Sequence, residues 1–115
     1  EAGARKVVVL PITIAAHSLL MASASVEFAK AIAATPIQPP QIPIISNVSA
    51  QPLNTVDEIR AELAAQLTAP VRWTESMTYL VEQGVDAVLE VGPGDVLLKL
   101  MKRIDRQTKR LSFEL

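Results

Sequence analysis

The order of apolar and polar positions divides the chain into extended and helical stretches. Residues 6–14 form a continuous β-branched run, which predicts a strand buried on both faces or crossing between layers. Pro11 interrupts this run and indicates an edge or a change of direction. Beyond His17, apolar residues recur every four positions, which predicts a helix that ends near Thr35, because Pro36 disfavours helical backbone before it.

The middle of the chain predicts a second strand and a capped helix. Three prolines make residues 36–41 a stiff connector, and the short apolar run 42–48 is typical of a buried strand followed by a loop over 47–52. Thr55 and Glu58 have the spacing of a capping box, which predicts a helix over 56–67.

The last third alternates in the same way. An apolar stripe from Trp73 to Val81 predicts a helix that Gly84 ends in the left-handed conformation. A strand over 86–91, a glycine-rich turn, a helix over 96–104 and a short strand over 111–115 follow. Alternating strands and helices predict an α/β fold with a mainly parallel sheet. Two or three strands are few for this many helices, so we expect the chain to be part of a larger α/β unit.

Composition narrows the function classes. The chain has 115 residues, which bounds it at one domain, and its net charge of −1 with four aromatic residues gives no basic field for nucleic acid. The absence of cysteine excludes disulfides and thiolate sites, and a single histidine with scattered carboxylates predicts no metal site. No apolar run approaches the roughly 20 residues of a membrane span.

His17 is the candidate reactive residue. It is the single histidine, and it lies where the extended run gives way to the helical pattern, a place where a side chain is both held and exposed. Considered alone, a histidine at such a boundary is more often a satisfied polar group than a base.

Four motifs in fixed order carry a family resemblance. They are Ala-His-Ser-Leu-Leu-Met at 16–21, Pro-Ile-Ile-Ser-Asn-Val at 43–48, Gln-Leu-Thr-Ala-Pro-Val-Arg-Trp at 66–73 and Glu-Val-Gly-Pro-Gly-Asp-Val-Leu at 90–97. Together they resemble the acyltransferase family of malonyl-CoA:acyl-carrier-protein transacylases. The resemblance implies an α/β-hydrolase-like acyltransferase domain, with residues 15–115 as its C-terminal part. Residues 1–14 would be the last strand of a small ferredoxin-like subdomain and its crossover.

The resemblance also implies a reaction. A serine in a G-x-S-x-G turn takes the malonyl group from malonyl-CoA and passes it to the phosphopantetheine thiol of acyl carrier protein, with ping-pong kinetics. His17 would be the general base, and the backbone carbonyl of Gln66 would orient it in place of a carboxylate. No cofactor is implied beyond the coenzyme A thioester substrate, and the implied setting is cytoplasmic fatty-acid synthesis.

The chain holds no G-x-S-x-G, so the serine and the arginine that pairs the malonate carboxylate belong to a missing N-terminal portion in the family pattern. We therefore expect this piece alone to be inactive. Ser18 is predicted to be an N-cap residue and not the nucleophile, because its side chain and that of the neighbouring His17 point in different directions. Gly92-Pro93-Gly94 predicts a tight turn. A loop that binds phosphate through its backbone N–H groups is less favoured, since Pro93 has no N–H to donate.

Two further sets of residues are candidates for recognition. Ala15 and Ala16 precede His17 and, by resemblance, are expected to contact the substrate and favour malonyl groups. Lys102, Arg103 and Arg106 could dock the acidic carrier protein, or form a solvated helix end.

Three alternatives stay open. A polyketide-synthase acyltransferase domain would use the same chemistry. A non-catalytic interaction fragment would have lost the serine half. A hydrolase of the α/β type would need a carboxylate to orient His17, and none of the motifs places one.

Overall fold

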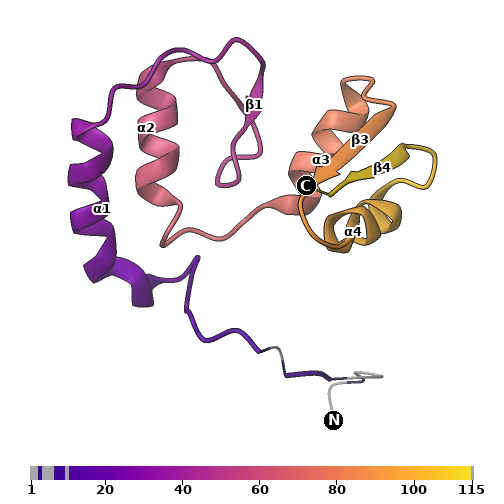
Figure 1. Ribbon diagram of the computed structural model, residues 1–115, viewed down its shortest axis with the longest axis horizontal. Helices are drawn as coiled ribbons and strands as arrows, with labels where there is room; N and C mark the ends of the chain where they lie inside the picture. The colour runs from indigo at the N-terminus through magenta and orange to yellow at the C-terminus, as the bar shows by residue number, and fades with distance from the viewer. Residues whose placement is uncertain (1–2, 4–6, 10, 115) are drawn as a thin grey trace.

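The computed structural model describes residues 3, 7–9 and 11–114 and shows two packed groups of elements joined by residues 66–72 (Figure 1). The elements in chain order are η1 Leu19–Met21, α1 Ala22–Ala34, β1 Ile44–Ile45, β2 Pro52–Leu53, α2 Val56–Ala65, α3 Trp73–Glu82, β3 Ala87–Val91, α4 Val96–Ile104 and β4 Lys109–Phe113.

The predicted helices are confirmed, and their ends follow from local chemistry. At the start of α2 the Thr55 hydroxyl accepts the Glu58 N–H while the Glu58 carboxylate accepts the Thr55 N–H, which completes the capping box. At the end of α3, Gly84 has φ +86° and donates to Val81, and Val85 donates to Leu80. This pair of bonds is the Schellman arrangement, which glycine accommodates without a Cβ penalty.

The sheet prediction is confirmed in part. β3 and β4 pair in parallel over five residues, with Leu89 opposite Leu111 and Val91 opposite Phe113, and α4 connects them. β4 therefore begins at Lys109, two residues before the predicted strand over 111–115, and Leu115 lies outside the described residues. The strands β1 and β2 form a separate antiparallel sheet. In the described residues, therefore, one of the two sheets is parallel and the other is not.

The loop predicted over 47–52 is partly wrong, because its end forms β2 and closes a hairpin on β1. The strand predicted over 42–48 is correspondingly short. The Ser46 hydroxyl accepts the N–H groups of Val48 and Ser49, and the Ser46 N–H donates to Gln51, so the chain reverses immediately after β1. This turn stops the strand that the apolar run predicts.

The strand predicted over 6–14 is not formed in its described residues, 7–9 and 11–14. Residues 6 and 10 lie outside the described part. Val7 and Val9 expose 82% and 92% of their surface, and no strand in the described chain lies beside them to complete a hydrogen-bonded ladder. An apolar β-branched run without a neighbour stays irregular, so burial on both faces is not observed.

The first group of elements consists of α1 and α2 side by side with the β1–β2 hairpin (Figure 1). Arg60 of α2 donates to the carbonyls of Ile32 and Thr35, which satisfies the carboxyl end of α1 and places a cation at the negative end of its dipole. The Glu62 carboxylate accepts the Ser46 hydroxyl and the Asn47 N–H, so α2 also holds the hairpin.

The second group consists of β3 and β4 with α3 and α4 (Figure 1). The two groups meet where the Arg72 N–H donates to the Asn47 carbonyl, at 2.7 Å, and where the Ser76 hydroxyl donates to the Ser46 carbonyl. These bonds join the start of α3 to the hairpin turn.

The core is thin for a chain of this size. Its accessible surface of 8909 Å² exceeds the about 6,100 Å² of a compact protein of its mass, and its radius of gyration of 16.5 Å exceeds the expected about 13 Å. Apolar residues remain exposed in register on one face of the parallel sheet, namely Leu89, Val91, Leu111 and Phe113. In the described residues, no helix combines the length and the apolar character that crossing a membrane requires.

Candidate active site

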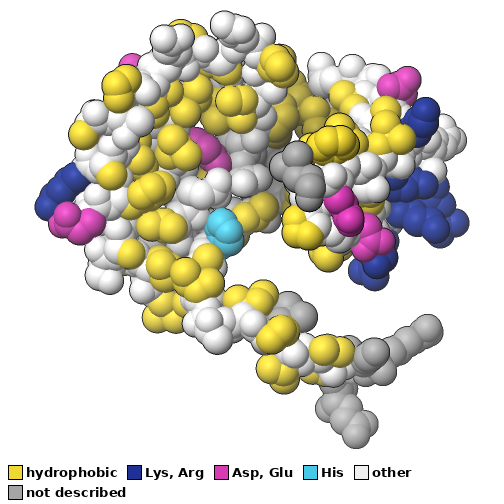
Figure 2. Space-filling model, viewed as in Figure 1, with side chains coloured by type: hydrophobic (Ala, Val, Ile, Leu, Met, Phe, Trp, Pro, Cys, Tyr) yellow, Lys and Arg dark blue, Asp and Glu magenta, His cyan; other side chains and the backbone are white. Residues whose placement is uncertain are grey.

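His17 lies at a turn between the irregular N-terminal segment and η1. Its backbone has φ +62°, the left-handed region, which costs a residue with a Cβ about 1–2 kcal/mol. The side chain is exposed, and Figure 2 shows the histidine in cyan on the open surface of the molecule. A histidine held in an unfavourable backbone conformation at the surface is typical of functional placement.

The imidazole is oriented by a main-chain carbonyl. His17 Nδ1 lies 2.8 Å from the Gln66 carbonyl oxygen. A carbonyl only accepts hydrogen bonds, so the proton is assigned to Nδ1 and the lone pair of the neutral ring to Nε2. The hydrogen bond that the family resemblance implies is therefore present, and it turns Nε2 into the available proton acceptor.

Gln66 occupies the end of a well-anchored helix. It is the C-cap residue of α2, its N–H donates to the Glu62 carbonyl at 2.9 Å, and its own carbonyl is one of the helix-end acceptors without an intrahelical donor. The negative end of the helix dipole lies at this carbonyl, which favours a donor that becomes cationic. In the described residues the Gln66 side-chain oxygen Oε1 is buried and has no hydrogen-bond partner.

The hydroxyl of Ser18 has a different partner from the one predicted. Ser18 stands at the N-cap position of η1, but its hydroxyl makes no capping bond and donates instead to the Ala15 carbonyl at 2.7 Å. Ser18 therefore occupies the predicted N-cap position, but the capping bond itself is absent, because its hydroxyl oxygen accepts no N–H group of η1. No contact to the imidazole is formed, in keeping with the prediction that Ser18 is not the nucleophile.

The residues predicted to contact substrate and carrier lie on open surface. Ala15 and Ala16 are exposed on the turn that carries His17.

On α4 and just beyond it, basic side chains line a shallow depression of about 350 Å³, and basic residues gather at one edge of the view in Figure 2. The residues of this basic face are Lys99, Lys102, Arg103 and Arg106. Lys99 pairs with Asp95 at 2.7 Å, whereas no ion pair involves the other three in the described residues.

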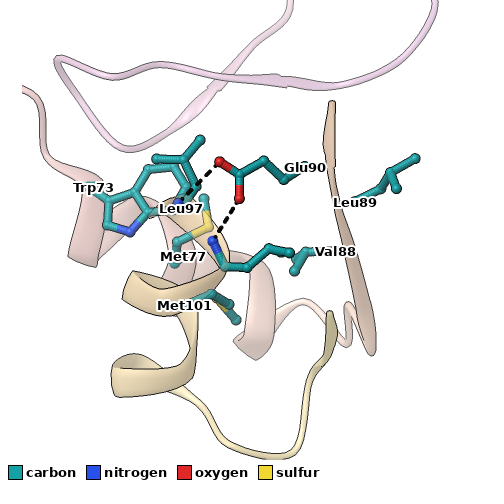
Figure 3. Close-up of a pocket in the computed structure, with 8 residues that line it drawn as sticks. Trp73, Met77, Val88, Leu89, Glu90, Leu97 and Met101 are labelled. Carbon is teal, nitrogen blue, oxygen red and sulfur yellow. Dashed lines mark hydrogen bonds between the residues drawn. The ribbon is translucent and has the colours of Figure 1, made fainter. Parts of the chain in front are cut away.

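The Gly92-Pro93-Gly94 segment is a tight turn, as predicted. Gly92 and Gly94 have φ +136° and +87°. The Glu90 carboxylate reaches across the turn and accepts the N–H groups of Leu97 and Leu98 at 3.2 and 3.0 Å (Figure 3). A phosphate would have to displace this carboxylate, so the phosphate-binding interpretation is wrong.

A small apolar cavity of about 70 Å³ lies behind this turn. Trp73 and Met77 of α3, Met101 of α4 and Glu90 of β3 are among the residues that line it (Figure 3). Neither member of the His17–Gln66 pair lines this cavity. It is a packing space between α3, α4 and the sheet, and not part of the candidate site.

Several chemistries are not supported by the described residues. The Gln66 carbonyl is the one hydrogen-bond partner of the imidazole there, so no carboxylate orients His17 as a hydrolase of the α/β type would require. The same part of the chain contains no cluster of three or more histidine, cysteine or acidic residues placed to hold a metal ion.

Sequence reasoning missed two polar contacts that support the site. The donation from Ser18 to the Ala15 carbonyl and the anchoring of Ser46 by Glu62 both depend on turns that no periodicity reveals. A serine directly after a histidine at an element boundary is the available signal for the first, since serine hydroxyls commonly close such turns.

Relatives cover nearly all of the chain. It is 42% identical over 104 residues to the polyketide biosynthesis protein ThaF of Burkholderia thailandensis, covering 90% of this chain and 9% of that protein. It is 40% identical over 103 residues to the malonyl CoA-acyl carrier protein transacylase of Escherichia coli K12, covering 90% of this chain and 33% of that enzyme. The chain thus spans about a third of the length of the transacylase.

A solved structure of a malonyl-transacylase has a similar fold. It is a holo complex of a type II polyketide-synthase acyl-carrier protein with its malonyl-transacylase, and it matches with a TM-score of 0.89 at 35% identity. The match covers 99% of this chain and 36% of that one. No family model matches the chain. The sequence and the fold together correspond to the C-terminal region of malonyl-CoA:acyl-carrier-protein transacylases.

Proposed function

We propose that this chain is the His-bearing part of an acyltransferase that moves a malonyl group from malonyl-CoA to the phosphopantetheine thiol of acyl carrier protein. The observation that carries the proposal is the 2.8 Å contact between His17 Nδ1 and the Gln66 carbonyl, formed between two of the four family motifs. The thin core and the exposed sheet face support the further proposal that the remaining two thirds of the enzyme pack against this part.

The proposed division extends to the subdomains. Residues 15–115 would complete an α/β-hydrolase-like acyltransferase domain, and residues 1–14 would become the last strand of a ferredoxin-like subdomain once neighbouring strands pair with them. The unpaired and exposed backbone around Val7–Val9 supports this role, because an isolated apolar run needs a ladder to satisfy its polar groups. The cytoplasmic setting implied by the resemblance belongs to the same proposal.

The reaction uses His17 twice. In the first half-reaction Nε2 takes the proton of a serine hydroxyl supplied by the other part of the enzyme, the serine oxygen attacks the malonyl thioester, and the proton passes to the departing coenzyme A thiolate. In the second, Nε2 takes the proton of the carrier thiol, whose sulfur attacks the malonyl-serine ester, and the imidazolium returns that proton to the departing serine oxygen. The Gln66 carbonyl keeps the ring orientation constant through both steps, and no cofactor enters either.

A histidine substitution tests this role. In the complete enzyme, His17→Ala is expected to lower the transfer rate by at least about 10²–10⁴-fold, the usual worth of general acid–base catalysis. The measurement is the formation of malonyl-carrier protein, with the malonyl-serine adduct followed by intact mass. Near-normal turnover in this variant would remove His17 from the mechanism and with it the proposed function.

We also propose that the basic face docks the carrier protein. Lys102, Arg103 and Arg106 are exposed, adjacent and without ion-pair partners in the described residues, which suits an acidic partner that must approach and leave repeatedly. Their neutralisation to glutamine is expected to raise KM for the carrier several-fold at low salt and to leave KM for malonyl-CoA unchanged. Lys30→Gln on α1, which removes an exposed cation paired with Glu27, is the matched control. Unchanged carrier kinetics in the triple variant would rule out this surface.

A polyketide-synthase acyltransferase is the second candidate. It is favoured by the 42% identity to a polyketide biosynthesis protein of which the chain covers 9%, so that the matching region there is a small part of a long polypeptide. The two candidates differ in the carrier and not in the chemistry. Parallel assays with a fatty-acid carrier and a polyketide carrier distinguish them, since the physiological partner is expected to have the higher kcat/KM.

Ala15 and Ala16 are proposed to border the acyl group. Both are small and exposed, and they directly precede His17 in the chain. Ala16→Val is expected to lower kcat/KM for malonyl-CoA, and an unchanged value would place the acyl group elsewhere.

A further inference from the structure

We propose that Ser18 is a positioning residue of the active site, whose hydroxyl closes the turn that holds His17 in the conformation from which Nδ1 reaches Gln66. Three features adjoin at this turn: the left-handed backbone of His17, the 2.7 Å bond from the Ser18 hydroxyl to the Ala15 carbonyl, and the 2.8 Å bond from His17 to Gln66. The inference rests on the proposed role of His17 as general base.

The backbone of His17 needs external support. At φ +62° the Cβ of an L-residue crowds the following carbonyl oxygen, and such a conformation persists where surrounding contacts over-determine it. The direction of the Cα–Cβ bond depends on the backbone angles. A return of His17 to an ordinary negative φ would therefore turn the imidazole away from the Gln66 carbonyl.

The Ser18 hydroxyl supplies that support from within the turn. Its bond to the Ala15 carbonyl spans Ala16 and His17, so the two residues whose angles define the turn lie inside the closed loop. The other side of Ser18 is anchored as well, because its carbonyl accepts the Met21 N–H at 3.0 Å and begins η1. Ser18 thus ties the turn to the first helical residues, and it is half-buried while His17 is exposed.

The alternative uses of this hydroxyl do not fit the contacts. It makes no N-capping bond to η1, and it makes no hydrogen bond to the imidazole, whose Nδ1 is engaged with Gln66. Its proton is committed to a backbone carbonyl. The bond from the Ser18 hydroxyl to the Ala15 carbonyl is therefore best explained as holding the backbone of His17 in place.

The test compares Ser18 variants with a matched serine in the complete enzyme. Ser18→Ala and Ser18→Val remove the hydroxyl, and Ser18→Thr keeps it in the shape of valine. Ser25 provides the control, because its hydroxyl makes the same bond at the same spacing, to the Ala22 carbonyl at 2.7 Å, within α1. Ser25→Ala therefore removes an equivalent hydrogen bond away from the turn.

The expected result is a fall in kcat of about 5- to 10-fold for Ser18→Ala and Ser18→Val, which is the usual net worth of one hydrogen bond, with KM for malonyl-CoA and for the carrier unchanged. Ser18→Thr is expected to stay within about twofold of the original enzyme, and so is Ser25→Ala. A purely structural role would lower thermal stability in Ser18 and Ser25 variants alike, without this difference in kcat.

Three outcomes overturn the inference: an unchanged kcat in Ser18→Ala and Ser18→Val, a threonine variant as slow as the valine variant, or an equal fall in kcat in Ser25→Ala. The parallel His17→Ala variant keeps the two proposals separate. If His17→Ala abolishes transfer while the Ser18 variants remain fully active, the general base stands and the positioning role falls. If His17→Ala is active, the proposed function itself fails.

Discussion

Two junctions lead into a helix in chemically opposite ways, one after β3 and the other after the irregular N-terminal segment. Between β3 and α4 the positive φ angles fall on Gly92 and Gly94, and the helix amides are capped by the Glu90 carboxylate. Between the N-terminal segment and η1 the positive φ falls on His17, and no side chain caps the helix. The first junction places its left-handed angles on glycines and caps the helix with a side chain, whereas the second does neither.

The difference supports the proposed catalytic role of the junction that carries His17. Glycine carries a left-handed angle at little cost, and the N–H groups of Gly92 and Gly94 also tie the 91–96 junction to the Phe113 carbonyl and the Glu114 carboxylate. The 14–22 junction places an exposed imidazole in a costly conformation and relies on two hydrogen bonds, one local and one to α2. Departures of this kind gather at functional sites, where the surrounding structure compensates for them.

The largest expected effect on stability lies at the glycine junction. Glu90→Ala removes the acceptor of the Leu97 and Leu98 N–H groups and is expected to lower the free energy of unfolding by about 2 kcal/mol, the upper range for losing an N-terminal cap. Urea denaturation of the complete enzyme gives the value. Asp95→Ala is the control, because Asp95 occupies the N-cap position without a capping bond and pairs with Lys99 on the surface. Equal losses in both variants would mean that the carboxylate of Glu90 is not the effective cap.

A glycine at the other junction measures the strain directly. His17→Gly and His17→Ala both lack the imidazole, but only alanine keeps a Cβ at φ +62°. We expect His17→Gly to be the more stable of the two by about 1 kcal/mol, while neither catalyses transfer. The difference in their urea midpoints checks this expectation. An alanine variant as stable as the glycine variant would show that the left-handed conformation relaxes once the imidazole is gone.

The carboxyl end of α4 extends the comparison to pH. The hydroxyl of Thr108, together with the N–H groups of Gln107 and Thr108, holds the pKa of Asp105 below its ordinary value. A lowered folded-state pKa stabilises the fold above the ordinary pKa of about 4, and this contribution is lost as the pH falls through the folded value. Asp105→Asn is therefore expected to be less stable than the original protein at pH of about 7 and to approach it at pH of about 2. A difference in urea midpoint that stays constant with pH would mean that the ionised form of Asp105 is not what the turn stabilises.

The sequence predicts most of this architecture where the signal is local. The Thr55–Glu58 capping box and Gly84 mark the limits of α2 and α3, and both are observed, because each depends on a few adjacent residues. The strand predicted over 6–14 is absent from its described residues, since an apolar run forms a strand only beside another strand. The sequence also does not predict the β1–β2 hairpin, because its turn is held by a contact between residues distant in the chain. Its turn depends on Ser46 and Glu62, which are 16 residues apart.

The candidate site shows the same difference between local signals and contacts that join distant residues. The contact between His17 and Gln66 joins residues 49 positions apart, and no rule of periodicity or spacing predicts it. The family resemblance implied it, and the fold brings the two together. The sequence predicts neither the left-handed angle of His17 nor the bond from Ser18 to Ala15, because a histidine followed by serine is compatible with many turns.

The smallest expected effect concerns the partner of His17, and it contrasts with Glu90. At the glycine junction the acceptor is a side chain, whereas at the histidine junction it is the main-chain carbonyl of Gln66. Gln66→Met keeps that carbonyl and removes a buried side-chain oxygen that has no partner in the described residues. Transfer by the complete enzyme is therefore expected to stay within about twofold of the original, with stability equal or higher, because an unpaired buried polar atom is costly. A loss of activity as large as that of His17→Ala would show that the Gln66 side chain, and not its carbonyl, orients the base.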